Sequence, residues 1–143
     1  MKVSLFLFLS VLITVSAYSQ EKTIPETEKN YIIKSIYFGG GSNRIDEIQL
    51  DELYQLMDSI PKIETFTISI HSHTDNIGGK EYNEWLSQKR SEAVINKLVD
   101  RGVFMEMIKQ RDFGQLNPVY DNSTWLGRMK NRRVDIIFWP SAL

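Results

Sequence analysis

Apolar residues in this chain follow two different periods, and the two periods alternate along the sequence. Between Thr65 and His71, apolar and polar residues alternate, which is typical of a half-buried strand. From Asp46 to Pro61, apolar residues recur every three or four positions, which indicates an amphipathic helix that Pro61 ends. The same criteria predict further strands at 31–38, 108–113 and 133–139, and further helices at 81–101 and 124–130.

Short strands separated by helices are typical of an α+β domain. The expected order is strand, helix, strand, helix, strand, short helix, strand, with no internal repeat. This order predicts a mixed sheet with helices packed on one face, which is a small α+β sandwich. The 143 residues are enough for one such domain, and we assign residues 31–143 to it.

The first thirty residues have a different character. Lys2 supplies a positive charge, an uncharged apolar run follows from Val3 to Val15, and small residues lead to Ser19. This pattern predicts a signal peptide over residues 1–19, and an uncleaved N-terminal anchor is the alternative. Residues 20–30 are polar and are expected to form a flexible leader.

Charge and cysteine content exclude several classes of function. The chain has 17 basic and 18 acidic residues, whereas a domain that binds phosphate backbones usually carries a basic excess. There is no cysteine, which removes disulfides, zinc–thiolate sites, thiol catalysis and lipid attachment through cysteine. We therefore expect no nucleic-acid partner, and no membrane span in the mature chain.

Polar residues of opposite charge are expected to meet where the second strand leads into the long helix. Asn83, Leu86, Ser87 and Arg90 lie on one helical face because residues three and four apart are neighbours. The glycine turn before this helix would bring Asp75 back beside that face. Asp75 and Arg90 would then face a common cleft, or would simply neutralise each other as a surface salt bridge.

Three motifs carry a family resemblance. They are H-T-D-N-I-G at 73–78, N-E-W-L-S-Q-K-R-S-E-A-V at 83–94 and G-R-M-K-N-R-R-V-D-I at 127–136, with a weaker I-Y-F-G-G-G-S at 36–42. Together they resemble the signatures of the OmpA C-terminal domain family, which includes Pal lipoproteins and the flagellar stator subunit MotB. The resemblance covers residues 33–138 and implies the OmpA-like arrangement of strands and helices.

The resemblance also implies a ligand and the residues that hold it. Family members bind the diaminopimelate of uncrosslinked peptidoglycan stems, and their ligand residues correspond to Asp75, Asn83, Arg90 and Arg128. An ammonium on Asp75 and a carboxylate on Arg90 would suit the two charges of diaminopimelate. The implied protein is periplasmic, binds peptidoglycan without being an enzyme, needs no cofactor, and could serve an outer-membrane or envelope complex.

Two positions depart from the family pattern. Ser72 stands where the family usually has glycine, and Gly39 stands where it usually has an aspartate. The Gly39 departure removes a carboxylate from the expected rim of the site. The alternative function is therefore an OmpA-like interaction module that has lost ligand binding.

His71, His73 and Asp75 raise a separate possibility, because alternate residues of a strand point to one side and could bind a metal. The string matches the start of the H-x-H-x-D-H motif of metallo-β-lactamase-like hydrolases. However, Asn76 occupies the sixth position and no later histidine exists. We expect no metal site, and we interpret His73 as a structural part of the H-T-D turn.

The remaining aromatic and basic residues are interpreted as structural. Trp85, Trp125 and Trp139 are expected to pack in the core or at its rim, and Arg132 and Arg133 to act as structural donors. The expected apolar helix faces also include Ile48, Trp85 and Val99.

Overall fold

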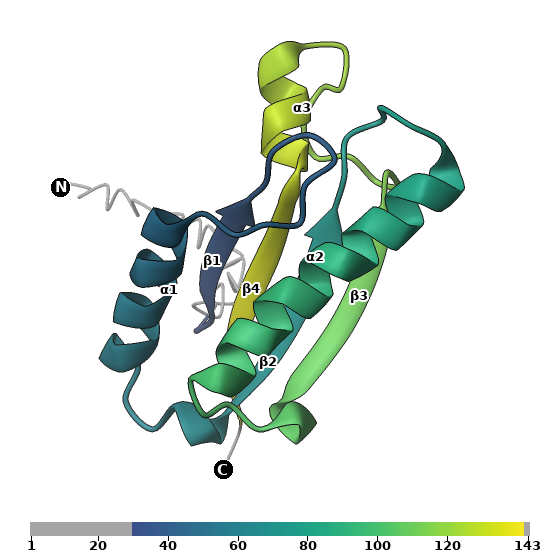
Figure 1. Cartoon of the computed structure of the whole chain (residues 1–143). Helices are drawn as coiled ribbons and strands as arrows, with labels where there is room; N and C mark the ends of the chain where they lie inside the picture. Colours follow the sequence, from purple (N-terminus) through teal and green to yellow (C-terminus); the bar gives the residue numbers. More distant parts are fainter. Residues whose placement is uncertain (1–29, 142–143) are drawn as a thin grey trace, which may run out of the picture.

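The computed structural model describes residues 30–141, so the expected signal peptide and nearly all of the leader lie outside the described residues. The elements follow the predicted order (Figure 1). They are β1 (Ile32–Tyr37), α1 (Glu47–Ser59), β2 (Phe66–His73), α2 (Lys80–Asp100), β3 (Ile108–Gly114), α3 (Trp125–Asn131) and β4 (Arg133–Pro140), with single 3₁₀ turns at Ile63–Thr65 and Met105–Met107.

The four strands form one mixed sheet in the order β1-β4-β2-β3. Strand β4 is antiparallel to both β1 and β2, whereas β2 and β3 are parallel. The alternation predicted for β4 places Val134, Ile136 and Phe138 on one face, and all three are 0% exposed. The predicted α+β class and mixed sheet are confirmed.

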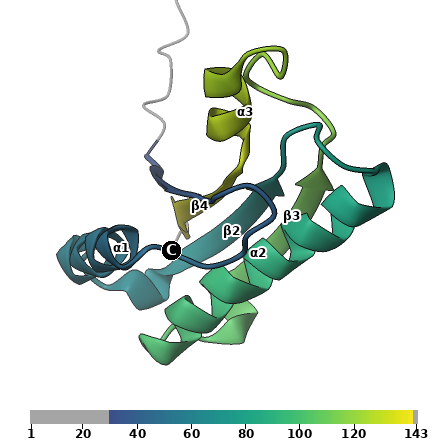
Figure 2. The same cartoon turned by 45° about the horizontal axis from the view of Figure 1, so that its top comes forward.

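Helices α1 and α2 cover one face of the sheet, while α3 lies beyond its end (Figures 1 and 2). Helix α1 begins where the Asp46 carboxylate accepts hydrogen bonds from the backbone N–H groups of Ile48 and Gln49. It buries Leu53 and Met57 against the core. Ile48, in contrast, is 70% exposed, so its assignment to the buried face was wrong.

Helix α2 changes character along its length. Its second half packs apolar Val94, Ile95 and Leu98 into the core, but its first half buries mainly polar side chains. Trp85 is 51% and Val99 is 39% exposed, so neither belongs to the apolar face that the period predicted. Buried polar side chains need hydrogen-bond partners. For α2 these partners must lie at the end of the sheet beside its first turns.

Several chain segments meet at that end. Strands β1, β2 and β3 all finish there, α2 begins there, and α3 leads into β4 there (Figure 1). The loops after β1 and β2 are therefore neighbours in space although they are far apart in sequence. Within residues 30–141, no helix combines the length and the apolar character that crossing a bilayer requires.

Candidate ligand-binding site

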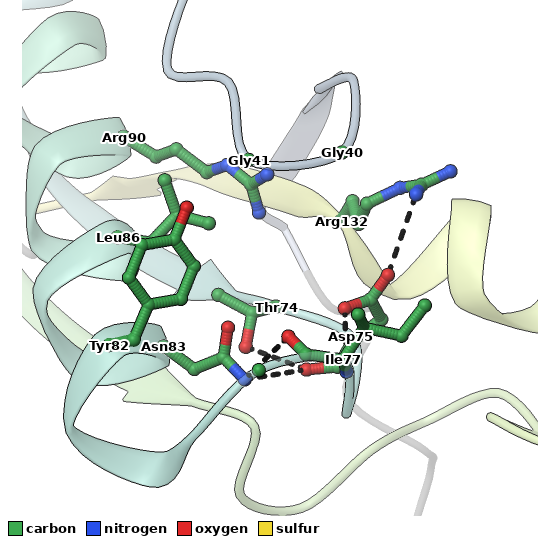
Figure 3. Close-up of a pocket in the computed structure, with 11 residues that line it drawn as sticks. Gly40, Gly41, Thr74, Asp75, Ile77, Tyr82, Asn83, Leu86, Arg90 and Arg132 are labelled. Atoms are coloured by element: carbon green, nitrogen blue, oxygen red, sulfur yellow. Dashed lines mark hydrogen bonds and ion pairs between the residues drawn. The ribbon is translucent and has the colours of Figure 1, made fainter.

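A cavity of about 240 Å³ opens between these loops (Figure 3). Its wall comes from the loop after β1, the loop after β2, the start of α2 and the junction of α3 with β4. The lining residues are Gly40, Gly41, Thr74, Asp75, Ile77, Gly78, Tyr82, Asn83, Leu86, Arg90 and Arg132. Three of the four ligand residues implied by the resemblance, namely Asp75, Asn83 and Arg90, are in this list.

Asp75 is the only carboxylate among the lining residues, and it is 6% exposed. One carboxylate oxygen accepts a hydrogen bond of 3.0 Å from the backbone N–H of Ile77, which fixes the turn after β2. The other lies 3.4 Å from Nη1 of Arg132. The expected alternative, in which Asp75 and Arg90 form a surface salt bridge, is wrong, because Arg90 is buried and its hydrogen bonds go to the backbone.

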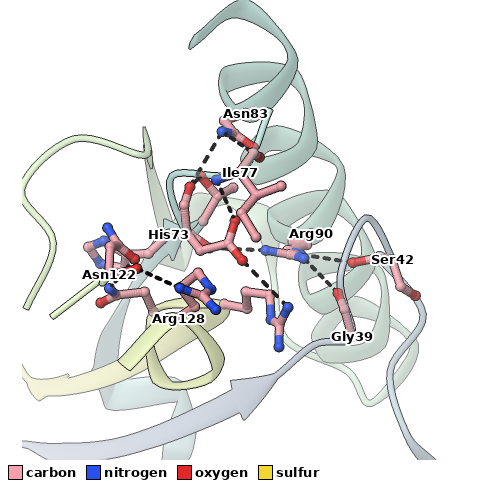
Figure 4. A network of polar contacts seen from close by, with 12 residues as sticks. Gly39, Ser42, His73, Ile77, Asn83, Arg90, Asn122 and Arg128 are labelled. Carbon is pink, nitrogen blue, oxygen red and sulfur yellow. Dashed lines mark hydrogen bonds and ion pairs between the residues drawn. The ribbon is translucent and has the colours of Figure 1, made fainter. Parts of the chain in front are cut away.

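Arg90 is 0% exposed and is held by three backbone carbonyls (Figure 4). Its Nε donates to Ser42 at 2.8 Å, Nη1 to His73 at 3.2 Å and Nη2 to Gly39 at 3.0 Å. The guanidinium also lies over the ring of Phe38, with Cζ 5.1 Å from the centroid. Arg90 thus joins the loop after β1 to the end of β2.

The charge of Arg90 survives this burial. Removal from water lowers its pKa to about 10, although the nearby Asp75 carboxylate acts in the opposite direction. The side chain therefore stays positive at neutral pH. Guanidinium has five N–H groups, and the three carbonyls use three of them, so two N–H groups remain for a carboxylate. Gly41 and Tyr82 are neighbours on this side of the cavity, where a Cβ on Gly41 would stand 3.3 Å from the Tyr82 hydroxyl oxygen.

Asn83 is 1% exposed and anchors the loop after β2 to helix α2. Its amide nitrogen donates to the carbonyl of Ile77 at 3.1 Å and to Oε1 of Gln115 at 2.9 Å, and lies 3.4 Å from the Asp75 carbonyl. Its amide oxygen has no hydrogen-bond partner among the residues that the structure describes. An unused acceptor therefore belongs to a residue that lines the same cavity as Asp75.

Arg128 lies apart from the other three implied residues. It does not line the cavity, and its Nη1 donates to the backbone carbonyls of Asn122 at 2.9 Å and Ser123 at 3.2 Å. These contacts hold the loop before α3 (Figure 4). A ligand-binding role for Arg128 stays a prediction, and its visible contacts are structural.

Arg132 is the charged lining residue that the sequence interpretation missed. It was expected to be structural, yet its side chain is 17% exposed, lines the cavity and pairs with Asp75. The signal that could have identified it is the one-turn spacing from Arg128 at the end of the short helix. Arg133, by contrast, is 6% exposed, and its Nε donates to Asp135, in keeping with a structural role.

The rest of the third motif shapes the loop before α3. A Cβ on Gly127 would come within 1.8 Å of the Asp121 carbonyl oxygen, so only glycine fits. Asn131 is 1% exposed and exchanges hydrogen bonds with the backbone of Tyr120, accepting at 3.1 Å and donating at 2.8 Å. These contacts position the chain that delivers Arg132 to the cavity.

The two departures from the family pattern have clear locations. The Gly39 carbonyl accepts from Arg90, so this residue contributes through its backbone. The neighbouring Gly40 and Gly41 form the rim, and Gly41 adopts a positive φ of 64° that favours glycine. Ser72 is 0% exposed and its hydroxyl has no partner among the described residues.

The histidines face away from the cavity. His73 stacks on Phe113 with ring centroids 5.0 Å apart, and its Nε2 lies 3.9 Å from Asp135 on the sheet face opposite the helices. Asp75 instead points into the cavity toward Arg132. Within residues 30–141, no three histidine or carboxylate side chains gather as a metal site would require.

The fold and these motifs define the class of the protein. Residues 37–132 match the OmpA family, and the chain belongs to that family. The crystal structure of the peptidoglycan-associated lipoprotein from Burkholderia pseudomallei superposes with a TM-score of 0.64 at 30% sequence identity. The match covers 73% of this chain and 89% of that chain.

Two curated relatives illustrate the range of the family. The outer-membrane lipoprotein YfiB of Pseudomonas aeruginosa is 32% identical over 102 residues, covering 71% of this chain and 61% of the relative. The peptidoglycan-binding protein ArfA of Mycobacterium bovis is 33% identical over 102 residues, covering 71% of this chain and 31% of the relative. The chain thus spans only part of the length of these relatives.

Proposed function

We propose that the protein binds peptidoglycan non-covalently, through the diaminopimelate of the stem peptide, and performs no chemical reaction. The observation that carries the proposal is one cavity that contains a carboxylate, Asp75, and two arginines, Arg90 and Arg132. The relative ArfA is named a peptidoglycan-binding protein, and the similar crystal structure is that of a peptidoglycan-associated lipoprotein. Both names support peptidoglycan as the ligand.

The charges of the cavity match a zwitterion. The side-chain end of diaminopimelate carries an ammonium and a carboxylate on one carbon. The ammonium can donate to Asp75 and to the unused amide oxygen of Asn83. The carboxylate first meets the partly exposed Arg132 and can then reach the two unused N–H groups of Arg90. A lysine-type stem lacks this carboxylate and is expected to bind more weakly.

Co-sedimentation with purified diaminopimelate-type sacculi tests the proposal, and the informative variant is Asp75→Asn. The new amide oxygen still accepts from the Ile77 N–H, so the turn persists while the charge is lost. A charge-assisted hydrogen bond contributes about 1.5–3 kcal/mol, so affinity should fall about 10- to 150-fold.

The matched control is Asp58→Asn, which removes the same charge from a surface pair with Arg101. It should pellet like the wild type. The proposal fails if the wild-type protein stays in the supernatant, or if Asp75→Asn pellets as well as the control. Free diaminopimelate added as a competitor should release the bound wild-type protein.

A second candidate function is protein interaction without a ligand, and one observation favours it. An apolar groove of about 420 Å³ lies between the end of β1 and α3. Leu126 in its wall is 55% exposed and Met129 is 36% exposed. Under this function, a natively folded protein would remain in the supernatant of the sacculus experiment.

We also propose that the protein acts in the periplasm and serves an outer-membrane or envelope complex. The expected signal peptide and the description of YfiB as an outer-membrane lipoprotein support this location. Fractionation of the source cells, followed by N-terminal sequencing of the purified protein, tests both export and cleavage after Ser19.

A further inference from the structure

Two aromatic side chains lie exposed beside the cavity, on the first turns of α2. Tyr82 is 45% exposed and Trp85 is 51% exposed. Their ring centroids are 5.8 Å apart with an interplanar angle of 34°, so the rings contact each other. Tyr82 also lines the cavity (Figure 3), which makes the aromatic surface continuous with the proposed stem-peptide site. We call Tyr82 and Trp85 the aromatic shelf.

The aromatic shelf is not needed for packing the core. Trp85 is absent from the hydrophobic cluster between the helices and the sheet, and half of its surface is open to water. Exposing large aromatic surface costs free energy, and such residues often mark binding surfaces. The helical neighbours of Trp85 are Glu81, Gln88 and Lys89, which all carry hydrogen-bonding groups. Gln88 and Lys89 also donate to Glu92.

We propose that the aromatic shelf binds a pyranose ring of the glycan strand to which the stem peptide is attached. One face of a pyranose carries C–H groups, which pack on an aromatic ring, while the hydroxyl and amide groups at its edge hydrogen-bond to surrounding polar side chains. The aromatic shelf with its neighbours Glu81, Gln88 and Lys89 offers both kinds of contact.

The covalent structure of the ligand brings a sugar to this place. This inference rests on the proposed function, in which diaminopimelate, the third residue of the stem, occupies the cavity. The two preceding residues and the link to the sugar span roughly 10 Å when extended, at about 3.3–3.6 Å per residue. Tyr82 is at the cavity wall and Trp85 is one turn further along α2, so the sugar can reach the aromatic shelf.

Calorimetric titration with two ligands tests the inference. One ligand is the free diaminopimelate-containing tripeptide, and the other is the same tripeptide attached to its disaccharide. The wild-type protein should bind the disaccharide form roughly five- to tenfold more tightly, as expected for one aromatic contact. Trp85→Ala should lose this preference while its affinity for the free tripeptide changes less than about twofold, since Trp85 does not line the cavity.

Trp125→Ala is the matched control, because Trp125 is 67% exposed on α3 and does not line the cavity. It should keep the full preference for the disaccharide form. The inference is overturned if the wild type binds both ligands equally, if Trp85→Ala keeps the preference, or if it weakens both ligands alike. A wild type that binds neither ligand contradicts the proposed function itself, which is a different result.

Discussion

Arg90 combines a structural role, seen in its hydrogen bonds, with the ligand-binding role that we propose for it. Its side chain joins the carbonyls of Gly39, Ser42 and His73, and it also lines the cavity with two N–H groups that these three bonds leave unused. A substitution at Arg90 therefore affects folding as well as binding. This is why Asp75→Asn, which keeps the size of the side chain and the Ile77 hydrogen bond but removes the charge, is the cleaner test of the ligand.

We predict that Arg90→Ala lowers the free energy of unfolding by about 3 kcal/mol or more. The change leaves three backbone carbonyls without their donor, one at a buried contact (His73) and two at part-buried contacts (Gly39 and Ser42), and each such loss costs about 1–3 kcal/mol. Urea denaturation measures the effect. Arg128→Ala is the control, since it removes two carbonyl contacts at a partly exposed site and should cost about 1 kcal/mol. Equal losses for the two variants would contradict the organising role of Arg90.

We predict that His73 makes the protein less stable as the pH falls. Burial lowers the pKa of His73 from 6.5 to about 4, with Arg133 acting in the same direction and Asp135 against it. The unfolded chain takes up this proton near pH 6.5 while the folded protein resists it until about pH 4. The free energy of unfolding should therefore decrease between these two values and change little above them.

The variant that isolates this effect is His73→Phe, which keeps an aromatic ring against Phe113 and cannot titrate. Urea denaturation of both proteins at several pH values should show a shallower decrease for the variant. Parallel curves for the two proteins would assign the acid sensitivity to other groups.

Spacing placed Asn83 and Arg90 on one helix face, and the family resemblance then selected Asp75, Asn83 and Arg90, which are three of the cavity's four charged or amide residues. They can be told apart because Asp75 follows a strand, whereas Asn83 and Arg90 are seven residues apart on one face of α2. Arg132 was missed because Arg128, Arg132 and Arg133 are chemically identical and close in sequence. Helix α3 ends at Asn131, directly before Arg132, and this end point places the Arg132 guanidinium at the cavity. The end point depends on tertiary contacts between Asn131 and the loop before α3, which the local sequence does not reveal.

At the scale of elements, the short helix α3 depends on one close contact. The Asp121 carbonyl occupies the space where Gly127 would carry a side chain. We predict that Gly127→Ala destabilises the protein by about 1–3 kcal/mol, because the loop before α3 must move. The same loop positions Arg132, so ligand affinity should fall as well.

Gly79→Ala is the control for this variant. A Cβ on Gly79 meets nothing within 4 Å, and its φ of −77° suits any residue. Thermal unfolding should show a change within about 1 kcal/mol for the control. A Gly127→Ala protein as stable as the control would mean that the loop relaxes without cost.

The elements themselves were predictable because their periods are long and regular, whereas their ends and exposed faces were not. Strand β2 was expected to end at His71 but continues to His73, because both β3 and β4 supply partners for the last two residues. The exposures of Ile48 and Trp85 were missed because a period defines a helix face but not which part of it a neighbouring element covers.

At the scale of the whole molecule, the sheet ends on β3, which pairs only with β2. An open strand edge invites pairing with another molecule, and charged side chains usually prevent it. Lys109 and Arg111 are exposed on this strand. We predict that the double variant Lys109→Val, Arg111→Val associates in a concentration-dependent manner, as measured by light scattering.

The control for this prediction is the double variant Arg44→Val, Lys80→Val. It also removes two positive charges, but from exposed positions outside the sheet. It should remain as dispersed as the wild type. Equal scattering by both double variants would show that net charge, and not the strand edge, controls association.

The position of the cavity relative to the strands has a mechanical consequence. Strand β1 begins at Ile32, beside Phe138 near the end of β4, and it finishes at Tyr37, just before the cavity residue Gly40 (Figure 1). A load applied between residue 30 and an occupied cavity would therefore run along the strands. Such a load would shear β1 against β4, so that the hydrogen bonds between the two strands share the force simultaneously and do not break in sequence.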